Sequence, residues 1–416
     1  MAKFIIELVE RSGNISTMNA PYPTRATGVS RLPESASNDY EKCANCSKRG
    51  CTLRCSRCRV TDIGTLQIFY CSAACQKRHW PSHKEICRPR QQLARAVSII
   101  SEIWTAFEQK TYMAPVSISG PVVDGVLDVQ GDGGAAIRRR GWTGDSMFRR
   151  FPSDVLPAGM NQLMKMAVLY DVGGAEPSTT GLKLLQLLLE PLCYRMRENE
   201  CRIKDPAIVV RDRSDDANLY GSSVFLTVMT SGGETFVVDL TGSQYGCEEK
   251  LYEWNVFRKN RSNGLRGAPT PLGEDRSVDA VYSLLNPTSP CWVARFIRIN
   301  IITELCAYIE PIIAHTATNV KGFMALPDGE FATARQRLVS KATTFLDRQM
   351  QELYQRGIGR VYFDEKLDVC VTKTEEEASR LRNVWLPEEE VERLGDETSL
   401  KRAWLRRLAN ANRNHD

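Results

Sequence analysis

The chain has 416 residues, of which 42% are hydrophobic and 25% are charged, and its formal net charge is +5. This length is sufficient for a small module followed by one large or two ordinary domains, and the composition is that of a globular protein. No run approaches the roughly eighteen apolar residues that a membrane-spanning helix needs, so we expect no role at a membrane.

The N-terminal forty residues differ in composition from the rest. A short apolar patch is followed by a stretch rich in Ser, Thr, Pro and Asn, so we interpret residues 1–40 as a flexible segment. The apolar patch is interrupted by Lys3, Glu7 and Glu10, unlike a secretory signal peptide. We therefore expect the protein to be located in the nucleus or the cytoplasm. The positive excess lies in residues 41–90, with eleven basic and three acidic side chains.

Residues 43–87 offer four pairs of potential metal ligands. The pairs are two C-x2-C, one C-x3-C and one H-x3-C: Cys43 and Cys46, Cys55 and Cys58, Cys71 and Cys75, and His83 and Cys87. Eight such ligands suit two tetrahedral Zn²⁺ sites that leave no position open for water or substrate, so the zinc is structural. We disfavour disulfides, because thiols stay reduced in the nucleus and cytoplasm.

Two further side chains in this region have ligand chemistry. His79 follows Cys75 at a spacing that also suits ligands on one helical turn. We prefer His83, because it completes a pair with Cys87. Cys51 is an additional cysteine, and we interpret it as a spare thiol.

This region resembles a MYND-type zinc finger. The residues that carry the resemblance cover about a tenth of the chain and are Tyr70-Cys71-Ser72, Cys75-Gln76, Trp80, His83-Lys84 and Cys87. The resemblance implies an interleaved, cross-braced pairing. One Zn²⁺ is then held by Cys43, Cys46, Cys71 and Cys75, and the other by Cys55, Cys58, His83 and Cys87. The twelve residues between Cys58 and Cys71 are a longer insert than is usual in this family.

Within the finger (residues 41–90), residues 66–70 are predicted to form a strand that leads into Cys71. Ser72 is predicted to cap a helix that ends near Pro81. Such a small module buries too little apolar surface to fold alone, so zinc supplies about 10–16 kcal/mol of folding free energy per site. A separate connecting helix is predicted over residues 91–115, from apolar residues at alternating steps of four and three. They are Leu93, Val97, Ile100, Trp104 and Phe107.

Residues 116–416 are predicted to form an α+β body that is mainly helical with antiparallel β-hairpins, because strands and helices do not alternate regularly. A break near residues 265–290 would divide it into two subdomains. Helices are predicted over residues 158–170, 180–197, 293–313 and 331–355. Strands are predicted over residues 116–129, 207–210, 223–229 and 235–240, with a hairpin over 360–372. A turn is predicted at 131–134, and short charged helices close the chain.

Two enzyme classes share features with this sequence. Some MYND-type proteins are SET-domain methyltransferases, but their Asn-His motif and glycine-rich cofactor segment are absent here. Asp239 and the segment that follows it faintly resemble the end of a hairpin in papain-like cores, and also segments of filamentous-fungal finger proteins. Serines, Ser222 and Ser223, stand where the catalytic histidine is expected. We interpret Asp239 as a turn residue and Cys193 as a buried helical thiol, so we predict no catalytic site.

These observations favour a protein-interaction adaptor. MYND-type fingers receive short proline-containing peptides, which implies a protein partner and roles in transcriptional regulation or ubiquitin-ligase recruitment. A peptide that pairs with residues 66–70 would then be contacted by Gln76 and Trp80. Trp80 is equally compatible with packing under the zinc site. The alternatives are a nucleic-acid-binding transcription factor and an enzyme with an unrecognised site in the body. The oligomeric state is open.

Overall fold

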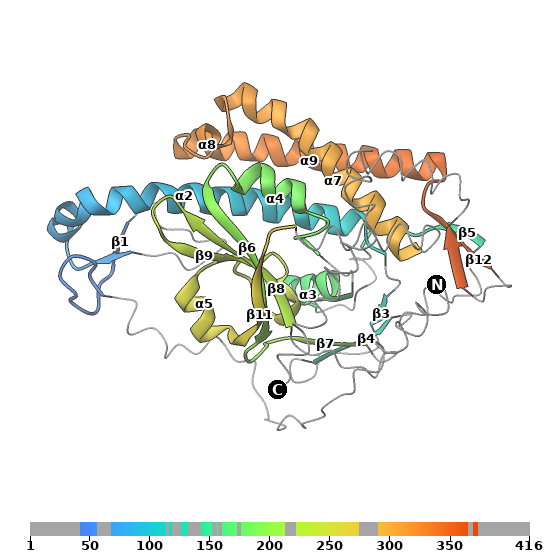
Figure 1. Ribbon diagram of the computed structural model, residues 1–416, viewed down its shortest axis with the longest axis horizontal. Helices are drawn as coiled ribbons and strands as arrows, with labels where there is room; N and C mark the ends of the chain where they lie inside the picture. The colour runs from blue at the N-terminus through green and yellow to red at the C-terminus, as the bar shows by residue number, and fades with distance from the viewer. Residues whose placement is uncertain are drawn as a thin grey trace, which may run out of the picture.

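The computed structural model describes residues 42–55, 68–113, 116–118, 126–131, 143–151, 156, 160–172, 176–212, 222–273, 290–364 and 369–372 (Figure 1). Several predictions fall outside these ranges. They concern the segment 1–40, Cys58, the turn at 132–134 and the charged helices after residue 372.

One long helix, α2 (Ala73–Lys110), connects the cysteine-rich region to the body (Figure 1). Ser72 caps it as predicted, because its side chain accepts a hydrogen bond from the Cys75 amide. The predicted end near Pro81 is wrong, since the helix continues through Pro81 and Pro89. The predicted connecting helix is therefore the second half of α2. Proline inside a helix costs about 3 kcal/mol, so contacts outside the helix backbone must hold this segment.

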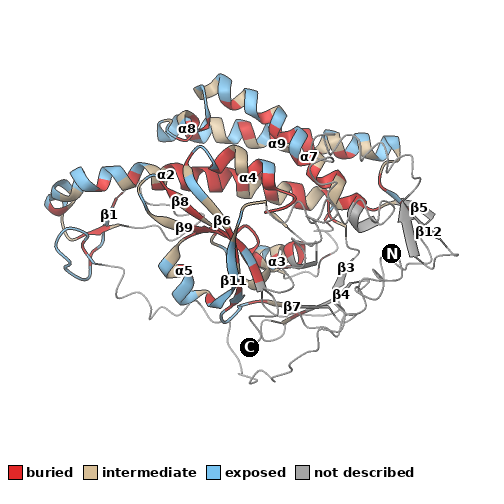
Figure 2. Cartoon of the chain, viewed as in Figure 1, coloured by how far each residue is buried: buried red, intermediate tan, exposed pale blue. Residues whose placement is uncertain are grey.

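The second half of α2 is buried in the main hydrophobic core. All five predicted apolar positions, Leu93 to Phe107, are 0% exposed. They share this core with α4 (Leu182–Leu189), α7 (Pro290–Ala317) and α9 (Asp328–Arg356), and the short α8 (Val320–Phe323) also packs there. Figure 2 shows buried residues gathered along these helices where they face one another. Ion pairs join α2 to the other helices, the most buried being Glu108 with Arg298 of α7.

The central sheet has five antiparallel strands in the order β10-β9-β8-β6-β11. Its side chains alternate between two faces. Leu226 and Val228 point toward the helical core, while Phe225 and Val237 pack toward α5 (Trp254–Asn260). The strands are β6 (Cys193–Ile203), β8 (Ser222–Thr230), β9 (Thr235–Val238), β10 (Leu251–Glu253) and β11 (Ser262–Pro271).

Two smaller sheets complete the body. The predicted hairpin of β12 (Arg360–Asp364) and β13 (Val369–Thr372) is present, and β5 (Thr143–Ser146) pairs with β12. In the other sheet β4 (Val126–Gly131) pairs with β3 (Val116–Ile118), and in parallel with β7 (Val209–Asp212). Helix α3 (Gln162–Val172) packs on this sheet through a small apolar cluster. The α+β class is confirmed.

One predicted helix is half wrong. The helix expected over residues 180–197 ends at Leu189, and β6 begins at Cys193. Pro191 lies between them, where its missing N–H and fixed backbone angle favour the end of the helix. Cys193 is therefore a strand residue and not a helical thiol. The break near 265–290 stays a prediction, although α7 and α9 share one core with α2 and α4.

Candidate metal centre

The cysteine-rich region is built around a minimal antiparallel ribbon. Strand β1 (Leu53–Arg54) pairs with β2 (Phe69–Tyr70), which agrees with the described part of the predicted strand. On its other side β2 receives a hydrogen bond from Ala44, whose amide lies 2.9 Å from the Phe69 carbonyl oxygen. The strand therefore brings Cys43 and Cys71 to the start of α2.

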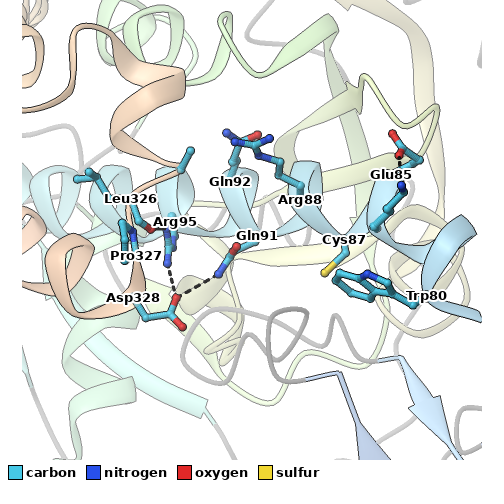
Figure 3. A pocket seen from close by; sticks show the side chains of 12 residues that line it. Trp80, Glu85, Cys87, Arg88, Gln91, Gln92, Arg95, Leu326, Pro327 and Asp328 are labelled. Atoms are coloured by element: carbon cyan, nitrogen blue, oxygen red, sulfur yellow. Dashed lines mark hydrogen bonds and ion pairs between the residues drawn. The ribbon is translucent and has the colours of Figure 1, made fainter. Parts of the chain in front are cut away.

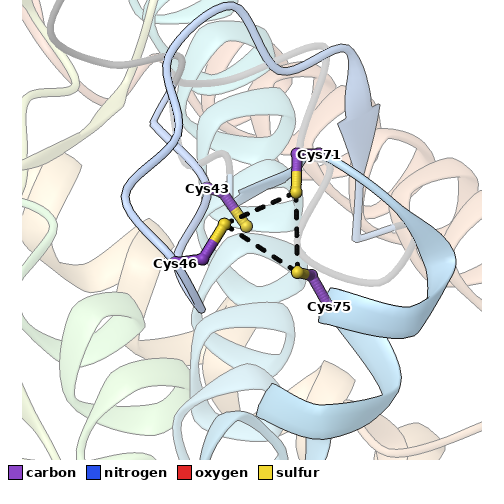
Figure 4. Close-up of side chains that lie close together, drawn as sticks. All are labelled: Cys43, Cys46, Cys71 and Cys75. Carbon is purple, nitrogen blue, oxygen red and sulfur yellow. Dashed lines mark hydrogen bonds between the residues drawn. The ribbon is translucent and has the colours of Figure 1, made fainter.

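Four sulfur atoms meet at this point. The Sγ atoms of Cys43, Cys46, Cys71 and Cys75 all lie within 4.8 Å of one another (Figure 4). Cys71 Sγ is 3.5 Å from both Cys46 Sγ and Cys75 Sγ, and the Cys46 and Cys75 sulfurs are 3.9 Å apart. A tetrahedron with Zn–S bonds of about 2.3 Å has edges of about 3.8 Å, so these distances fit one zinc ion.

A second group is formed by the residue that follows β1 and two residues of α2. It consists of Cys55, His83 and Cys87, all buried, with Cys55 Sγ and Cys87 Sγ 3.8 Å apart. His83 and Cys87 are four residues apart, so the helix places them on one face. Cys58, the fourth predicted member, lies outside the described residues. Seven of the eight predicted ligands thus form the two groups that the resemblance implied.

The thiols of the first group influence one another's protonation. Hydrogen bonds to Cys75 and Cys46 raise the pKa of Cys71 to about 12. Burial opposes ionisation of Cys43, but backbone amides outweigh it and lower its pKa to about 6. Asn45 Nδ2 donates a hydrogen bond to Cys75 Sγ at 3.4 Å. These thiols share protons, which a divalent cation displaces when it binds thiolates.

The two alternative ligands have other contacts. His79 Nδ1 lies 3.0 Å from the Tyr70 hydroxyl oxygen, and its ring stacks on His83 with centroids 5.6 Å apart. Cys51 is buried, and its Sγ donates a hydrogen bond to the Lys48 carbonyl oxygen at 3.1 Å. Among the described residues neither side chain belongs to a group with metal-ligand geometry.

A family model described as MYND finger matches residues 43–87. This segment is a MYND finger. It is therefore a zinc-binding, non-catalytic module of the kind that mediates protein–protein interaction.

The curated relatives share this segment. Tudor domain-containing protein 1 of Mus musculus is 50% identical over 50 residues, which are 12% of this chain and 4% of the mouse protein. The human protein of the same name is 45% identical over 49 residues, again 12% of this chain and 4% of the relative. The chain thus covers a small part of these relatives. No solved structure matches it.

The two predicted peptide contacts lie on the surface of the MYND finger. Gln76 is half-buried in the first turns of α2, and Trp80 follows one turn later with 38% of its surface exposed. The indole also meets the ring of His83 edge-on, with centroids 5.9 Å apart. The packing interpretation of Trp80 agrees with the contact to His83, and the peptide contact stays a prediction for the part of the indole that faces solvent.

The predicted site of strand addition needs a correction. Both edges of β2 are occupied by this chain, β1 on one side and the Cys43–Ala44 backbone on the other. In the described part of the finger, β1 has no second strand partner, and both of its residues are exposed. A peptide that adds a strand here would pair with β1 and not with β2.

Asp239 and Cys193, the two body residues compared with a catalytic pattern, lie in the central sheet region. Asp239 is buried and accepts a hydrogen bond from the Thr241 amide at 3.2 Å, as expected of a turn residue. Burial lowers the pKa of neighbouring Lys250, whose Nζ donates to Ser243 Oγ at 2.6 Å. Burial also raises the pKa of Cys193 to about 12, so this thiol is protonated and weakly nucleophilic at neutral pH.

Residue-by-residue inspection of the sequence missed the contacts between the finger helix and the body. Arg90 forms ion pairs with Glu234 of the β8–β9 turn and Glu253 of β10, and Arg95 forms one with Asp328 at the start of α9. The only sign of these contacts in the sequence is that two arginines lie next to the apolar stripe of the helix. The structure shows that both are buried. Among the described helices, none is both long and apolar enough to cross a membrane.

Proposed function

We propose that this protein is a regulatory adaptor whose MYND finger holds two structural Zn²⁺ ions and docks a short, proline-containing peptide of a partner protein. The ligands are those of the interleaved pairing: Cys43, Cys46, Cys71 and Cys75 for one ion, and Cys55, Cys58, His83 and Cys87 for the other. The observation that carries the docking function is the exposed face of Trp80, one turn after Gln76 on a helix fixed by metal ligands.

The geometry supports recognition by two elements. The exposed edge of β1 offers backbone groups for an added strand, and the α2 face with Gln76 and Trp80 offers side-chain contacts. An indole is a suitable surface for a proline ring, because its flat apolar face packs against the rigid apolar ring and proline loses almost no side-chain conformational entropy on contact. Closed zinc sites shape this surface and take no part in chemistry.

The proposal also includes the cellular process and the compartment in which the protein acts. A peptide-docking adaptor of this kind would act in transcriptional regulation or ubiquitin-ligase recruitment, in the nucleus or the cytoplasm. On the face of α2 that carries Trp80, two of the cations have acidic partners, Lys84 with Glu85 and Arg95 with Asp328, and this mixed charge disfavours insertion into a nucleic-acid groove. The second alternative is an enzyme whose unrecognised active site lies in the body.

Metal analysis tests the zinc assignment. Cys71→Ser should lose about one zinc ion per chain, because it removes one corner of the four-sulfur group. Cys51→Ser is the matched control, since Cys51 is a buried cysteine of the same module outside both groups. It should retain two ions. Two zinc ions retained in Cys71→Ser, or a loss in Cys51→Ser, would overturn the ligand assignment.

Peptide binding tests the docking assignment. Fluorescence anisotropy with a library of proline-containing decapeptides should detect binding that Trp80→Ala weakens at least tenfold. Tyr194→Ala is the control, because Tyr194 of β6 is an exposed aromatic residue of the body, outside the finger. Equal binding by the wild type and Trp80→Ala contradicts this site. Tight, steeply salt-dependent binding to random duplex DNA would favour the nucleic-acid alternative.

A further inference from the structure

A groove runs along α2 from the finger to the body. It has a volume of about 620 Å³ and lies between the exposed face of α2 and the connection from α8 to α9 (Figure 3). Trp80 stands at the finger end, and Leu326, Pro327 and Asp328 form the wall at the body end. The groove therefore begins at the proposed peptide contact and continues onto the body.

The floor of the groove is a single stripe of α2. Its members are spaced by four, four, three and four residues, so they lie within an arc of about 80° on the helix. They are Trp80, Lys84, Arg88, Gln91 and Arg95. From the first to the last the helix rises about 22 Å, the length of about seven residues of extended peptide.

The body wall is fixed to α2 by hydrogen bonds. Arg95 donates to the carbonyl oxygens of Met324 and Leu326 at 3.0 and 2.6 Å, and it also forms an ion pair with Asp328. Gln91 Nε2 donates to Asp328 Oδ1 at 3.2 Å (Figure 3). These contacts keep the groove open before a ligand arrives, which reduces the entropic cost of binding.

A second set of contacts fixes α2 itself. The buried Arg90 guanidinium holds Glu234, with Nε and Nη2 at 2.8 and 2.5 Å from the two carboxylate oxygens. A Cβ atom placed on Gly232, in the same β8–β9 turn, would lie 3.4 Å from Ile86. The turn therefore rests directly against the finger half of α2. The finger and the body thus present one continuous surface.

The charge of the groove favours an acidic ligand. The carboxylate of Asp328 is already paired with Arg95. Glu85 is 3.9 Å from Lys84 with both side chains largely exposed, a weak pair. Arg88, exposed in the middle of the stripe, has no ion-pair partner among the described residues. Of the cations that line the groove, Arg88 is therefore the least committed to an acidic partner, and its guanidinium can bind a carboxylate in a bidentate manner.

We propose that this groove extends the peptide site onto the body and selects extended peptides with a carboxylate about four residues from the residue on Trp80. The spacing follows from the separation of Trp80 and Arg88 by eight positions, over which the helix rises about 12 Å, the length of about four residues of extended chain. This inference rests on the proposed function, because Trp80 anchors the same peptide. It adds the partner's chemistry, a proline-containing segment with an acidic residue at a fixed distance.

The test uses the full chain loaded with zinc and three sets of decapeptides. Each carries one proline anchor and, four residues to either side of it, Glu, Gln or Lys. We expect the Glu peptide to bind about threefold more tightly than the Gln peptide, the ratio that a partly exposed ion pair provides, and the difference to shrink in high salt. Arg88→Glu should reverse the order, so that the Lys peptide binds best.

Lys341→Glu is the matched control. It makes the same charge reversal at an exposed position in the middle of α9, outside the groove, and should leave the Glu preference intact. If Trp80→Ala abolishes binding while Glu, Gln and Lys peptides bind the wild type equally, the groove proposal is wrong and the docking function stands. If none of the peptides binds, both fall. If Arg88→Glu removes binding to single-stranded RNA instead, the groove is a nucleic-acid site and the proposal is overturned.

Discussion

The two halves of α2 are held in place by different chemistry. In the finger, the buried cluster consists of five cysteines with Phe69 and Tyr70. In the body, residues 93–107 of the same helix join a core of leucine, isoleucine, valine and aromatic side chains from the other helices and the central sheet. Figure 2 shows the corresponding change along α2, from mostly exposed at the finger to mostly buried in the body. One helix therefore depends on metal at one end and on apolar burial at the other.

The prolines of α2 sharpen this contrast. Pro81 and Pro89 both lie in or beside the finger half. Each removes a backbone hydrogen bond and costs about 3 kcal/mol in a helix interior. The side chains of Cys75, His83 and Cys87 project from this half into the two metal groups. Metal ligation therefore offsets a local sequence that disfavours a helix, whereas the body half needs no such help.

Removal of zinc should produce the largest difference in stability between the two halves of α2. A chelator such as EDTA withdraws about 10–16 kcal/mol per structural site, more than the finger's few buried side chains contribute. Hydrogen exchange followed by mass spectrometry should then show lost protection in residues 73–87 and retained protection in residues 93–107. Re-addition of zinc should restore the protection and serves as the control. Loss of protection in both halves at once would show that the finger and the body unfold as one unit.

Trp104→Ala should have the opposite effect. Trp104 is 0% exposed and packs against Phe107 with ring centroids 5.3 Å apart. Its truncation leaves a large cavity and should cost about 3–5 kcal/mol of the free energy of unfolding. Denaturant unfolding measures this loss, and metal analysis of the folded variant should still find the zinc content of the wild type. Trp80→Ala, which truncates a half-exposed indole of the same helix, should cost less. Equal losses would contradict the division of α2.

The stability that the Arg90 ion pairs contribute at the junction between the two halves of α2 should depend on pH. Burial raises the pKa of Glu253, and the nearby Arg90 opposes that rise. Arg90→Leu leaves Glu253 and Glu234 without this cation and should cost about 3 kcal/mol at neutral pH.

The sign of this pH effect follows from proton binding. A carboxyl group with a raised pKa in the folded state binds more protons there than in the unfolded state, so stability falls as pH rises through that pKa. The loss in Arg90→Leu should therefore be largest at neutral pH and shrink as the pH falls through the raised pKa of Glu253 and this carboxyl group becomes protonated. A series of urea denaturation curves from pH 4 to 8 measures it, with Arg258→Leu on α5 as the control. A loss that does not change with pH would exclude these ion pairs as its cause.

How much the sequence could predict differs between the two regions. The candidate ligands followed from the spacing of their pairs, whereas their division into two interleaved groups, with Cys43, Cys46, Cys71 and Cys75 in one of them, followed from the resemblance to MYND-type fingers. The stripe from Leu93 to Phe107 followed from helical periodicity. The end of the helix at Pro81 was predicted wrongly, because local propensity ignores the metal groups and the body contacts that hold the helix beyond that residue. The pairing of β4 with β7 depends on distant segments, and periodicity alone carries no information about it.

Ser72→Ala should produce the smallest effect and is the finest test of the contrast. The Ser72 hydroxyl accepts a hydrogen bond from the Cys75 amide at 3.2 Å, so it fixes the first turn of α2 next to two members of the four-sulfur group. Loss of such a cap costs about 1 kcal/mol. Because finger folding and zinc binding are coupled, this cost should appear as an approximately fivefold weaker zinc affinity. Competition with a chromophoric chelator measures it. The melting temperature of the body should stay unchanged, since the cap lies far along α2 from the core.

Asn319→Ala is the matched control, because Asn319 caps α8 in the body through the Gly322 amide at 2.8 Å. It should weaken the body slightly and leave zinc affinity intact. If Ser72→Ala lowers body stability instead of zinc affinity, the first turn of α2 is coupled to the core and not to the metal.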